Sequence, residues 1–529
     1  MRGMSTSEDS SLTALTALTT LRAELEAERA ARRALEAERA ALAERNRRLD
    51  HLVRELRQAL YGRKSEKLTA DERQLAFEDL ETAVAEVEVA PTEARTARTA
   101  STPAHAQRNI GRLPADLPRI ERVVEPRSTL CPCGCGEMAR IGEDRTERLD
   151  IIPAQLRVIV TVRPRYACRR CKSAVVQAQA PARLIEGGLP TEALIAHVLV
   201  SKYADHLPLY RQAQIFARSG VTLDRSTLAG WVGKAAFHLG PIVDRMTAEL
   251  KRSERLFMDE TPAPVLDPGR GKTKTGYLWA LARDDRRWGG ADPPAVVYAY
   301  APGRGAEHPQ RILDGFSGVL QVDGYAAYKA VSRGRGPDAP LRLAHCWAHG
   351  RRKLREVFDS DASPIAAEGL RRIAELYAIE AEIRGLGADA RVAARKARSA
   401  SLVAAFRAWL DAARARVSAK SRVGEKLGYF AGHWDGLILF LDDGRVEMDT
   451  NPVENAIRPL TLNRKNALFA GHDEGGRAWA RIASLIETAK MNGVEPFAWL
   501  TATLQAVAAG HPARRIDELL PWNFKPPSS

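Results

Sequence analysis

The spacing of apolar residues predicts a long helix near the start of the chain that pairs with a second copy of itself. Its leucines recur at multiples of seven residues, which is the repeat of a two-stranded coiled coil. They are Leu21, Leu35, Leu42, Leu49 and Leu56. Asn46 occupies the companion position, where an amide can set the register. Arg32 and Arg39 weaken the middle of the seam, so a solvated helix without a partner is the alternative. We assign residues 15–68 to this coiled coil and 1–14 to a disordered N-terminus.

The pattern changes after residue 68. Residues 69–112 contain much Thr, Ala, Pro and Arg and lack apolar periodicity, which predicts a partly disordered linker. Residues 113–183 carry β-branched runs that partly alternate with polar positions, and this predicts short strands. Residues 184–250 return to a helical pattern.

The helical stretch 184–250 contains a pattern typical of the DNA-binding helix-turn-helix. One helix ends at Ser219-Gly220, a short turn follows, and Asp224 or Ser226 can cap the second helix. Ordinary helix hairpins share this pattern, so the alternative is a purely structural pair of helices. The candidate DNA contacts are Arg211, Arg218 and Arg225.

Five apolar runs between residues 251 and 350 predict five strands, with a short helix before the fourth. The strands are expected at 256–266, 276–284, 295–302, 318–325 and 341–347, and the helix at 308–316. Residues 351–445 are dominated by Ala, Arg, Leu and Glu and predict helices only. Residues 446–508 are again rich in helix, and 509–529 form a tail. The expected fold class is a multidomain α/β protein.

The charge of the chain points to its kind of partner. Its 529 residues include 80 Lys and Arg against 66 Asp and Glu, a formal net charge of +14. Such a surplus favours a polyanionic partner, and nucleic acid is the first candidate. Apolar runs stay well short of the roughly 18 residues of a membrane-spanning helix. The first residues contain no apolar signal core, so roles in export or in a membrane are not expected.

Five of the six cysteines lie between Cys131 and Cys171, which suggests a metal site in a reducing compartment. Cys168 and Cys171 form a C-x-x-C pair, a spacing that lets two thiolates bind one tetrahedral ion. The upstream cysteines Cys131, Cys133 and Cys135 are separated by one residue or by three. Four thiolates would close a structural Zn²⁺ site and leave one cysteine spare. Which upstream pair binds stays open, and structural cysteines without metal are the alternative.

Three acidic residues occupy positions typical of a divalent-cation site. Asp259 and Asp323 lie near the ends of expected strands, and Glu454 opens a helix. Two adjacent strand ends and a helix would gather three carboxylates around one or two ions such as Mg²⁺, which prefers oxygen ligands. Each acid has a structural alternative. Asp323 can form a turn, Asp259 can flank a strand exit, and Glu454 can complete a capping box with Asn451 as N-cap.

Stretches from nearly the whole chain resemble the large transposase of the insertion sequence 66 family, which belongs to the D-D-E transposases of ribonuclease H-like fold. The matching stretches include ALYGRKSEKL, the cysteine region from CPCGCG to CRRC, KYADHLPLYRQAQIF, MDETP, QVDGYAAY, AHCWAHGRRK, NPVENAIRPLTLNRKN, IETAKMNGVEPFAWL and IDELLPWNF. Their combination is specific, although single pieces such as C-x-x-C are not.

The resemblance implies a role for each acid. Asp259, Asp323 and Glu454 would be the catalytic carboxylates, holding Mg²⁺ or Mn²⁺, two ions in all. Cys346 and His349 resemble the C-x-x-H signature that follows the second Asp in several D-D-E families. We expect this pair to support the active site; the alternative is a half zinc site or a packed strand end.

Basic residues near these motifs are candidates for phosphate contacts, although a solvated basic face is the commoner explanation for any one of them. The candidates are Arg351, Arg352, Lys353, Arg458, Arg464 and Lys465. Arg458 follows Glu454 by four residues and shares its helix face if the helix continues. Pro459 argues against that continuation. The interval 351–445 would be a helical insertion between the last strand and the helix that carries Glu454.

The implied reaction is metal-dependent cleavage of DNA at the element end, followed by strand transfer of the freed 3′-hydroxyl into target DNA. The implied partners are double-stranded DNA, further copies of the chain and accessory proteins of the same element, in the cytoplasm and nucleoid of a bacterium. Two alternatives stay open: a DNA-binding regulator with an inactive core, and a nuclease without strand transfer. Glu260 is expected to matter far less than Asp259, because alternation along a strand turns it to the other face.

Overall fold

The computed structural model describes the chain in several stretches. These are residues 155–167, 175–267 and 272–526, together with positions 28, 29, 32 and 36. The chain forms two compact units, Met1–Glu86 and Val87–Ser529. The leucine repeat, the linker and the cysteines from Cys131 to Cys171 lie outside the described residues, so those predictions stay predictions.

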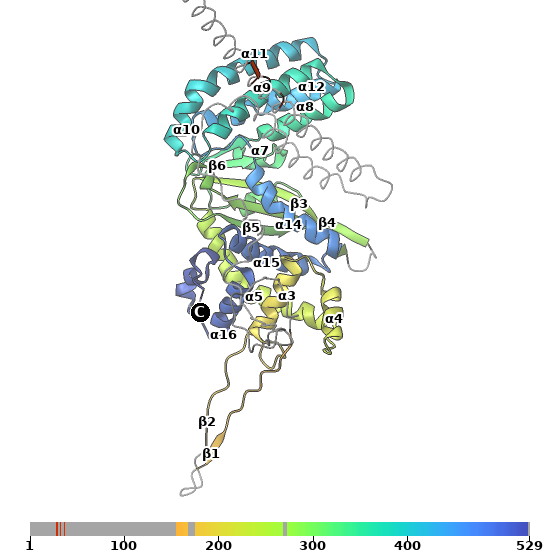
Figure 1. Ribbon diagram of the computed structural model, residues 1–529, viewed down its shortest axis with the longest axis vertical. Helices are drawn as coiled ribbons and strands as arrows, with labels where there is room; N and C mark the ends of the chain where they lie inside the picture. Colours follow the sequence, from red (N-terminus) through yellow and green to blue (C-terminus); the bar gives the residue numbers. More distant parts are fainter. Residues whose placement is uncertain are drawn as a thin grey trace, which may run out of the picture. The chain divides into compact units, whose positions relative to one another are not determined.

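A five-stranded mixed sheet forms the centre of the second unit (Figure 1). Its strands are β3 (Arg255–Asp267), β4 (Lys272–Arg283), β5 (Ala295–Ala301), β6 (Gly318–Val322) and β7 (Leu341–His345). In space their order is β5-β4-β3-β6-β7. The pairs β5–β4 and β4–β3 are antiparallel, whereas β6 runs parallel to both β3 and β7. Each of the five runs expected as a strand contains one, and the fold is mixed α/β.

The register of the sheet assigns Asp259 and Glu260 to opposite faces. Asp259 pairs with Ala280, which pairs with Tyr298, and residues opposite one another across a ladder share a face. The Tyr298 hydroxyl donates to the carbonyl of Ala456 at 2.5 Å. Because Ala456 belongs to α14 (Asn451–Ala467), that helix covers the face to which Asp259 points.

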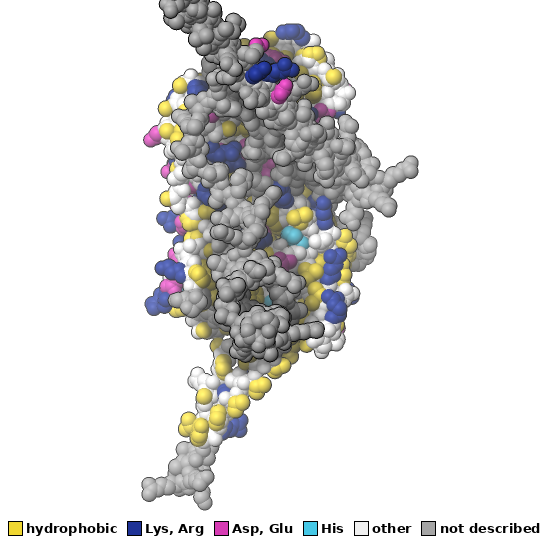
Figure 2. All heavy atoms as spheres, viewed as in Figure 1, with side chains coloured by type: hydrophobic (Ala, Val, Ile, Leu, Met, Phe, Trp, Pro, Cys, Tyr) yellow, Lys and Arg dark blue, Asp and Glu magenta, His cyan; other side chains and the backbone are white. Residues whose placement is uncertain are grey.

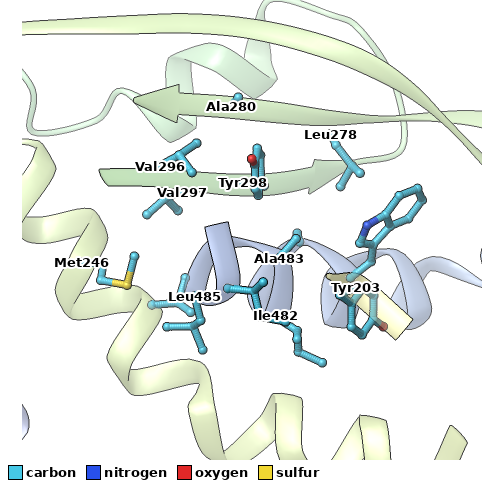
Figure 3. Packing of buried hydrophobic residues seen from close by; sticks show 14 of the residues in the cluster. Tyr203, Met246, Leu278, Ala280, Val296, Val297, Tyr298, Ile482, Ala483 and Leu485 are labelled. Carbon is cyan, nitrogen blue, oxygen red and sulfur yellow. The ribbon is translucent and has the colours of Figure 1, made fainter. Parts of the chain in front are cut away.

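Helices from both ends of the described chain pack together beside β5. They are α3 (Glu192–Tyr203), α4 (Leu209–Arg218), α5 (Arg225–Leu250), α15 (Asp473–Met491) and α16 (Pro496–Ala508), followed by the short turns Ala513–Leu519 and Pro521–Asn523. Figure 3 shows Leu485 of α15 beside Met246 of α5, in the hydrophobic cluster that also includes Val296 and Val297 of β5. None of the helices in the described stretches is long and apolar enough to cross a membrane.

Side chains of α15 close the open edge of the sheet. The Ser484 hydroxyl accepts from the backbone N–H of Tyr298 at 2.8 Å. Thr488 both accepts from the N–H of Val296 and donates to its carbonyl. Unpaired strand edges invite pairing with other chains, so these bonds both satisfy buried backbone groups and protect β5.

A helical block with its own hydrophobic core lies in sequence between β7 and α14. Its helices are α8 (Trp347–Asp361), α9 (Pro364–Glu382), α10 (Ala388–Ala394), a π-helical turn (Arg395–Ser399), α11 (Ala400–Arg416), α12 (Arg422–Gly432), α13 (Trp434–Leu437) and a 3₁₀ turn (Leu439–Leu441). Trp347, Phe406 and Phe430 are fully buried at its centre. This block occupies the interval 351–445 in which only helices were expected.

The short elements complete the described fold. They are β1 (Arg165–Ala167), β2 (Val175–Gln177), the 3₁₀ turn Arg286–Trp288, α6 (Glu307–Ile312) and α7 (Ala326–Arg333). β1 and β2 pair antiparallel, and in sequence the C-x-x-C pair falls between them. The expected helix at 308–316 corresponds to α6.

Two details of the expected helix ends are corrected by the structure. The helix that carries Glu454 begins at Asn451, with Thr450 rather than Asn451 at its N-cap. It also continues through Pro459 to Ala467, so the expectation of a break there is wrong. The proline is tolerated because its neighbours on α14, Val453 and Ile457, are buried in the core, and this packing outweighs one lost backbone hydrogen bond.

The expected helix-turn-helix has the local geometry of two helices joined by a turn. α4 ends at Arg218, and Gly220 adopts a left-handed backbone with φ of 81°, a conformation that glycine reaches without strain. α5 then begins at Arg225 with Asp224 at its N-cap, so Ser226 is not the cap. The Asp224 side chain makes no capping hydrogen bond.

Candidate active site on the central sheet

Asp259 and Asp323 occupy equivalent positions in the register of the neighbouring parallel strands β3 and β6. β3 pairs with β6 in a register that sets Phe257 opposite Gln321. Two residues further along each strand stand Asp259 and Asp323, the latter directly after the end of β6. Because side chains return to the same face every second residue, Asp259 faces the side that α14 covers, and the charge of Asp323 acts on both Asp259 and Glu260.

The segment before α14 is fixed on the sheet by two buried contacts that the sequence did not indicate. The Gln321 side-chain amide accepts from the backbone N–H of Glu447 and donates to its carbonyl, each at 2.9 Å. The N–H of Trp347 donates to the carbonyl of Met448 at 2.8 Å. These bonds hold the start of α14 against β6 and α8, and Glu454 thereby lies close enough to Asp259 for its charge to raise the pKa of that acid.

Glu454 lies in the first turn of α14 and is only 7% exposed. The Thr450 hydroxyl donates to its Oε1 at 2.6 Å. This bond differs from the capping box given as the structural alternative, in which Glu454 would have reached back to the backbone of Asn451. It orients the carboxylate and leaves Oε2 without a hydrogen bond from Thr450.

The three acids share one electrostatic environment. Burial raises the pKa of Asp259 well above its ordinary value, and the negative charges of Asp323, Glu260 and Glu454 raise it further, while His349 acts in the opposite sense. Several carboxylates desolvated together are costly unless a cation neutralises them. Hard divalent cations such as Mg²⁺ prefer oxygen ligands, so the carboxylates of Asp259, Asp323 and Glu454 are suitable ligands for such ions.

The C-x-x-H pair lies beside Glu454. Cys346 stands at the N-cap of α8 and is fully buried, and His349 is in the first turn of the same helix. His349 Nδ1 is 3.7 Å from Glu454 Oε1, which is too far for a hydrogen bond. Burial raises the pKa of the Cys346 thiol, and the charges of Glu454 and Asp449 add to this.

Tyr429 of the helical block reaches the ends of two central strands, a role that the sequence did not reveal. Its hydroxyl lies 2.8 Å from the carbonyl oxygen of Asp323 and 2.9 Å from that of Cys346. Gly324 next to it has a φ of 114°, and a Cβ there would lie 3.1 Å from the Tyr429 ring. The helical block thus helps to position the backbone of the second aspartate.

We expect Tyr429→Phe to slow the reaction of this site several-fold with little change in stability or DNA binding. The substitution removes only the hydroxyl that joins the two carbonyls, a loss on the order of 1 kcal/mol. Tyr377→Phe is the matched control, because the Tyr377 hydroxyl is buried in the same block without a hydrogen-bond partner. Equal rates for Tyr429→Phe and the wild type in a single-turnover assay would refute this positioning role.

Glu260 lies on the opposite face of the sheet from Asp259, although it stays within reach of the acids: burial and then the charge of Asp323 raise its pKa. It forms an ion pair with Arg304 and accepts a hydrogen bond from the Tyr328 hydroxyl at 2.8 Å. Its partner across the ladder, Trp279, packs edge-to-face with Tyr328. The expected alternation of Asp259 and Glu260 is present; the lower sensitivity of Glu260 to substitution stays a prediction.

The candidate DNA contacts fall into different environments. Arg211, Arg218 and Arg225 of the paired helices α4 and α5 are exposed, and Arg211 Nε donates to the Tyr210 hydroxyl. Figure 2 shows Lys and Arg side chains at several separate places on one face of the molecule. Lys465 on α14 is also exposed.

The remaining basic candidates are partly buried. These are Arg351, Arg352, Lys353, Arg458 and Arg464. Burial lowers the pKa of Arg352 and of Lys353. Arg464 donates to the carbonyl of Pro262 at 2.5 Å, so it fastens α14 to β3 and is already engaged within the protein.

Comparison with known proteins decides the family. A model described as the transposase IS66 family matches residues 187–478, more than half of the chain. The chain belongs to the IS66 transposase family. Further IS66 models match on both sides: the C-terminal element at 484–522 and the zinc-finger binding domain at 128–172. A model described as transposase C of IS166 homeodomain matches 48–122 and so crosses the expected boundary between coiled coil and linker.

Similar proteins from Sinorhizobium fredii align with most of this IS66 transposase-family chain. The uncharacterized protein y4jD is 49% identical over 423 residues, covering 79% of this chain and 83% of its own length. The uncharacterized protein y4qI is 46% identical over 488 residues, covering 90% and 89% of the two chains. The likeness therefore extends over the sheet, the helical block and α14 together.

Proposed function

We propose that this protein is a DNA transposase that cleaves the ends of its insertion sequence and joins them to target DNA by a D-D-E mechanism. The observation that carries the proposal is the convergence of Asp259, Asp323 and Glu454. Asp259 lies within β3, Asp323 directly follows the parallel neighbour β6, and Glu454 is buried on α14, which covers the face to which Asp259 points. Their mutual charge effect on the pKa of Asp259 supports their proximity.

The catalytic core would have the ribonuclease H-like fold that the sequence resembles. The order β5-β4-β3-β6-β7, with three antiparallel strands followed by two parallel ones, supports this assignment. The helical block between β7 and α14 would be an insertion into that core. Its separate hydrophobic cluster supports the assignment, because an inserted unit needs its own buried core to fold.

The three carboxylates would hold Mg²⁺ or Mn²⁺, two ions in all. Such ions supply charge neutralisation for the attacking and leaving oxygens of phosphoryl transfer. Asp259 and Asp323 would present oxygens from a rigid sheet. Thr450 would keep Glu454 in a fixed rotamer, and Tyr429 would fix the backbone of Asp323. Preorganised groups of this kind lower the barrier because they need little rearrangement during the reaction.

DNA would be held by surfaces outside the acidic cluster, since carboxylates repel phosphates. The exposed arginines of α4 and α5 and the zinc-finger region are the candidates. Cys168 and Cys171 with two of Cys131, Cys133 and Cys135 would bind a structural Zn²⁺. Self-association through residues 15–68 would bring two element ends together, and accessory proteins of the same element would join the assembly.

We expect DNA binding to weaken steeply with salt. Displacement of counterions from phosphates drives such binding, and four or more phosphate contacts imply at least a ~100-fold loss of affinity between about 50 and 200 mM salt. Replacing Arg218 and Arg225 by Ala should reduce the slope by up to about 2. Arg371→Ala is the control, because Arg371 already forms ion pairs with Glu368 and Glu375. An affinity that does not change with salt would contradict the proposal.

A joining assay separates the proposal from its alternatives. The full chain is mixed with Mg²⁺, a labelled duplex that carries the element end and a plasmid target. A transposase releases a 3′-hydroxyl and links it to the plasmid. A regulator with an inactive core binds the duplex without nicking it, and a nuclease nicks it without producing a joined product.

A further inference from the structure

A buried cluster beside the three acids combines a thiol, an imidazole and a carboxylate. The Cys346 Sγ, one ring nitrogen of His349 and one carboxylate oxygen of Glu454 all lie within 4.8 Å of one another. All three residues are buried. Two of them come from the start of α8 and the third from the start of α14, so two rigid helices fix the arrangement.

An unpartnered polar atom points to a ligand in this cluster. His349 Nδ1 is buried without a hydrogen-bond partner, and the side chain is nine-tenths buried. Buried polar atoms nearly always have a partner, and an orphan suggests an ion or molecule at that place. The nearest candidate partner, Glu454 Oε1, is 3.7 Å away, a separation typical of two ligands of one ion and too long for a hydrogen bond.

The donor set differs in kind from that of the Asp259–Asp323 pair. Sulfur and imidazole nitrogen are ligands for Zn²⁺ and similar transition metals, whereas Mg²⁺ takes oxygen ligands. Three protein ligands leave a fourth position open in a tetrahedral site. When such an ion binds, the thiol gives its proton to solvent, and the ion replaces that proton on sulfur.

We propose that Cys346, His349 and Glu454 form a second metal site, for Zn²⁺ or a similar transition-metal ion, that shares Glu454 with the catalytic acids. Because Glu454 is also one of the proposed catalytic acids, an ion held here would share that carboxylate with the catalytic site, and this coupling rests on the proposed function. The binding itself does not.

The test is a Co²⁺ titration of the full chain followed by absorption spectroscopy, with Cys346→Ser as the paired variant. Serine is a favourable N-cap residue, so the substitution should leave α8 intact. The cysteines of the zinc-finger region are the same in both proteins and cancel in the difference. We expect the wild type to bind one more equivalent of Co²⁺, with a thiolate-to-cobalt charge-transfer band in the difference spectrum. Superimposable titrations would overturn the proposal.

Four further variants test which residues bind the ion. His349→Gln and Glu454→Gln should each weaken the additional Co²⁺ binding by at least about tenfold. Loss of a residue that only hydrogen-bonds to a metal ligand already lowers metal affinity by about this much, so loss of a ligand should cost at least as much. His238→Gln, on α5, should leave it unchanged. The double variant Asp259→Asn, Asp323→Asn should retain the band; its loss would assign the ion to the catalytic acids and overturn the proposal. If the wild type shows the band but does not cleave element-end DNA, the metal site stands and the proposed function fails.

Discussion

Replacing Asp259, Asp323 or Glu454 singly by its amide is expected to lower the rates of DNA cleavage and strand transfer by more than about a thousandfold. Each substitution keeps the shape of the side chain and removes one negative charge from the set that would bind the cations. Loss of one group that stabilises the transition state already costs on the order of 10²–10³ in rate, and loss of a metal ligand costs more. Affinity for element-end DNA and the melting temperature should change little.

A buried carboxylate outside the set Asp259, Asp323 and Glu454 provides the control for that result. Glu487 on α15 is 8% exposed and pairs with Lys490 at 2.9 Å. Glu487→Gln should cleave and join DNA like the wild type. Glu260→Gln should retain far more activity than Asp259→Asn, since its side chain faces the other side of the sheet. An active Asp259→Asn together with an inactive Glu260→Gln would show that the assignment of these two acids is reversed.

Replacing Arg391 by Met is expected to destabilise the helical block by about 3 kcal/mol, because removing one partner leaves a buried charge uncompensated. Arg391 is 1% exposed and donates to Glu447 at 2.8 Å and to Glu380 at 3.3 Å. Calorimetry should show the transition of this block lowered by several degrees. The surface variant Arg371→Met is the control and should leave this transition in place, since solvent screens its ion pairs.

The loss of stability caused by Arg391→Met should depend on pH, and the pKa of Glu447 determines the direction of that dependence. Burial acts to raise the pKa of Glu447, but its hydrogen bond with Arg391 and the charges of Arg391, Arg287 and Arg255 outweigh burial and hold that pKa below its ordinary value of 4.5. A lowered pKa contributes stability that is present above the ordinary value and is lost as the pH falls through the lowered one. The difference in unfolding free energy between the wild type and Arg391→Met should therefore be largest at neutral pH and should become smaller below pH 4.5. A difference in unfolding free energy that increases in acid would contradict this account.

The sequence predicted the strands well because their signal is local. Runs such as Ala295–Ala301 are β-branched and aromatic over a few residues, and no distant contact is needed to recognise them. The position of Asp323 directly after a strand followed from the same signal, whereas Asp259 was expected near a strand end and lies inside β3, which continues to Asp267. The wrong helix break at Pro459 has the opposite cause: the local preference of the residue before a proline was overruled by packing of α14 on the sheet.

The groups that assemble the site could not be predicted because they depend on contacts between distant positions. Gln321 holds Glu447 across 126 residues, and Tyr429 reaches Asp323 across 106. A glutamine in a strand or a tyrosine in a helix has no sequence signal that names its partner. The absence of a hydrogen-bond partner for His349 Nδ1 likewise depends on how α8 and α14 pack, which the sequence does not indicate.

The most direct measurement of the central claim is the joining of a pre-cleaved element end, which already carries its 3′-hydroxyl, to a plasmid in the presence of Mg²⁺. The wild type should form the joined product, and Asp323→Asn should bind the same duplex equally well without joining it. Joining by Asp323→Asn at the wild-type rate, or a wild type that only nicks the plasmid, would contradict the account of Asp259, Asp323 and Glu454 as the catalytic carboxylates of a transposase.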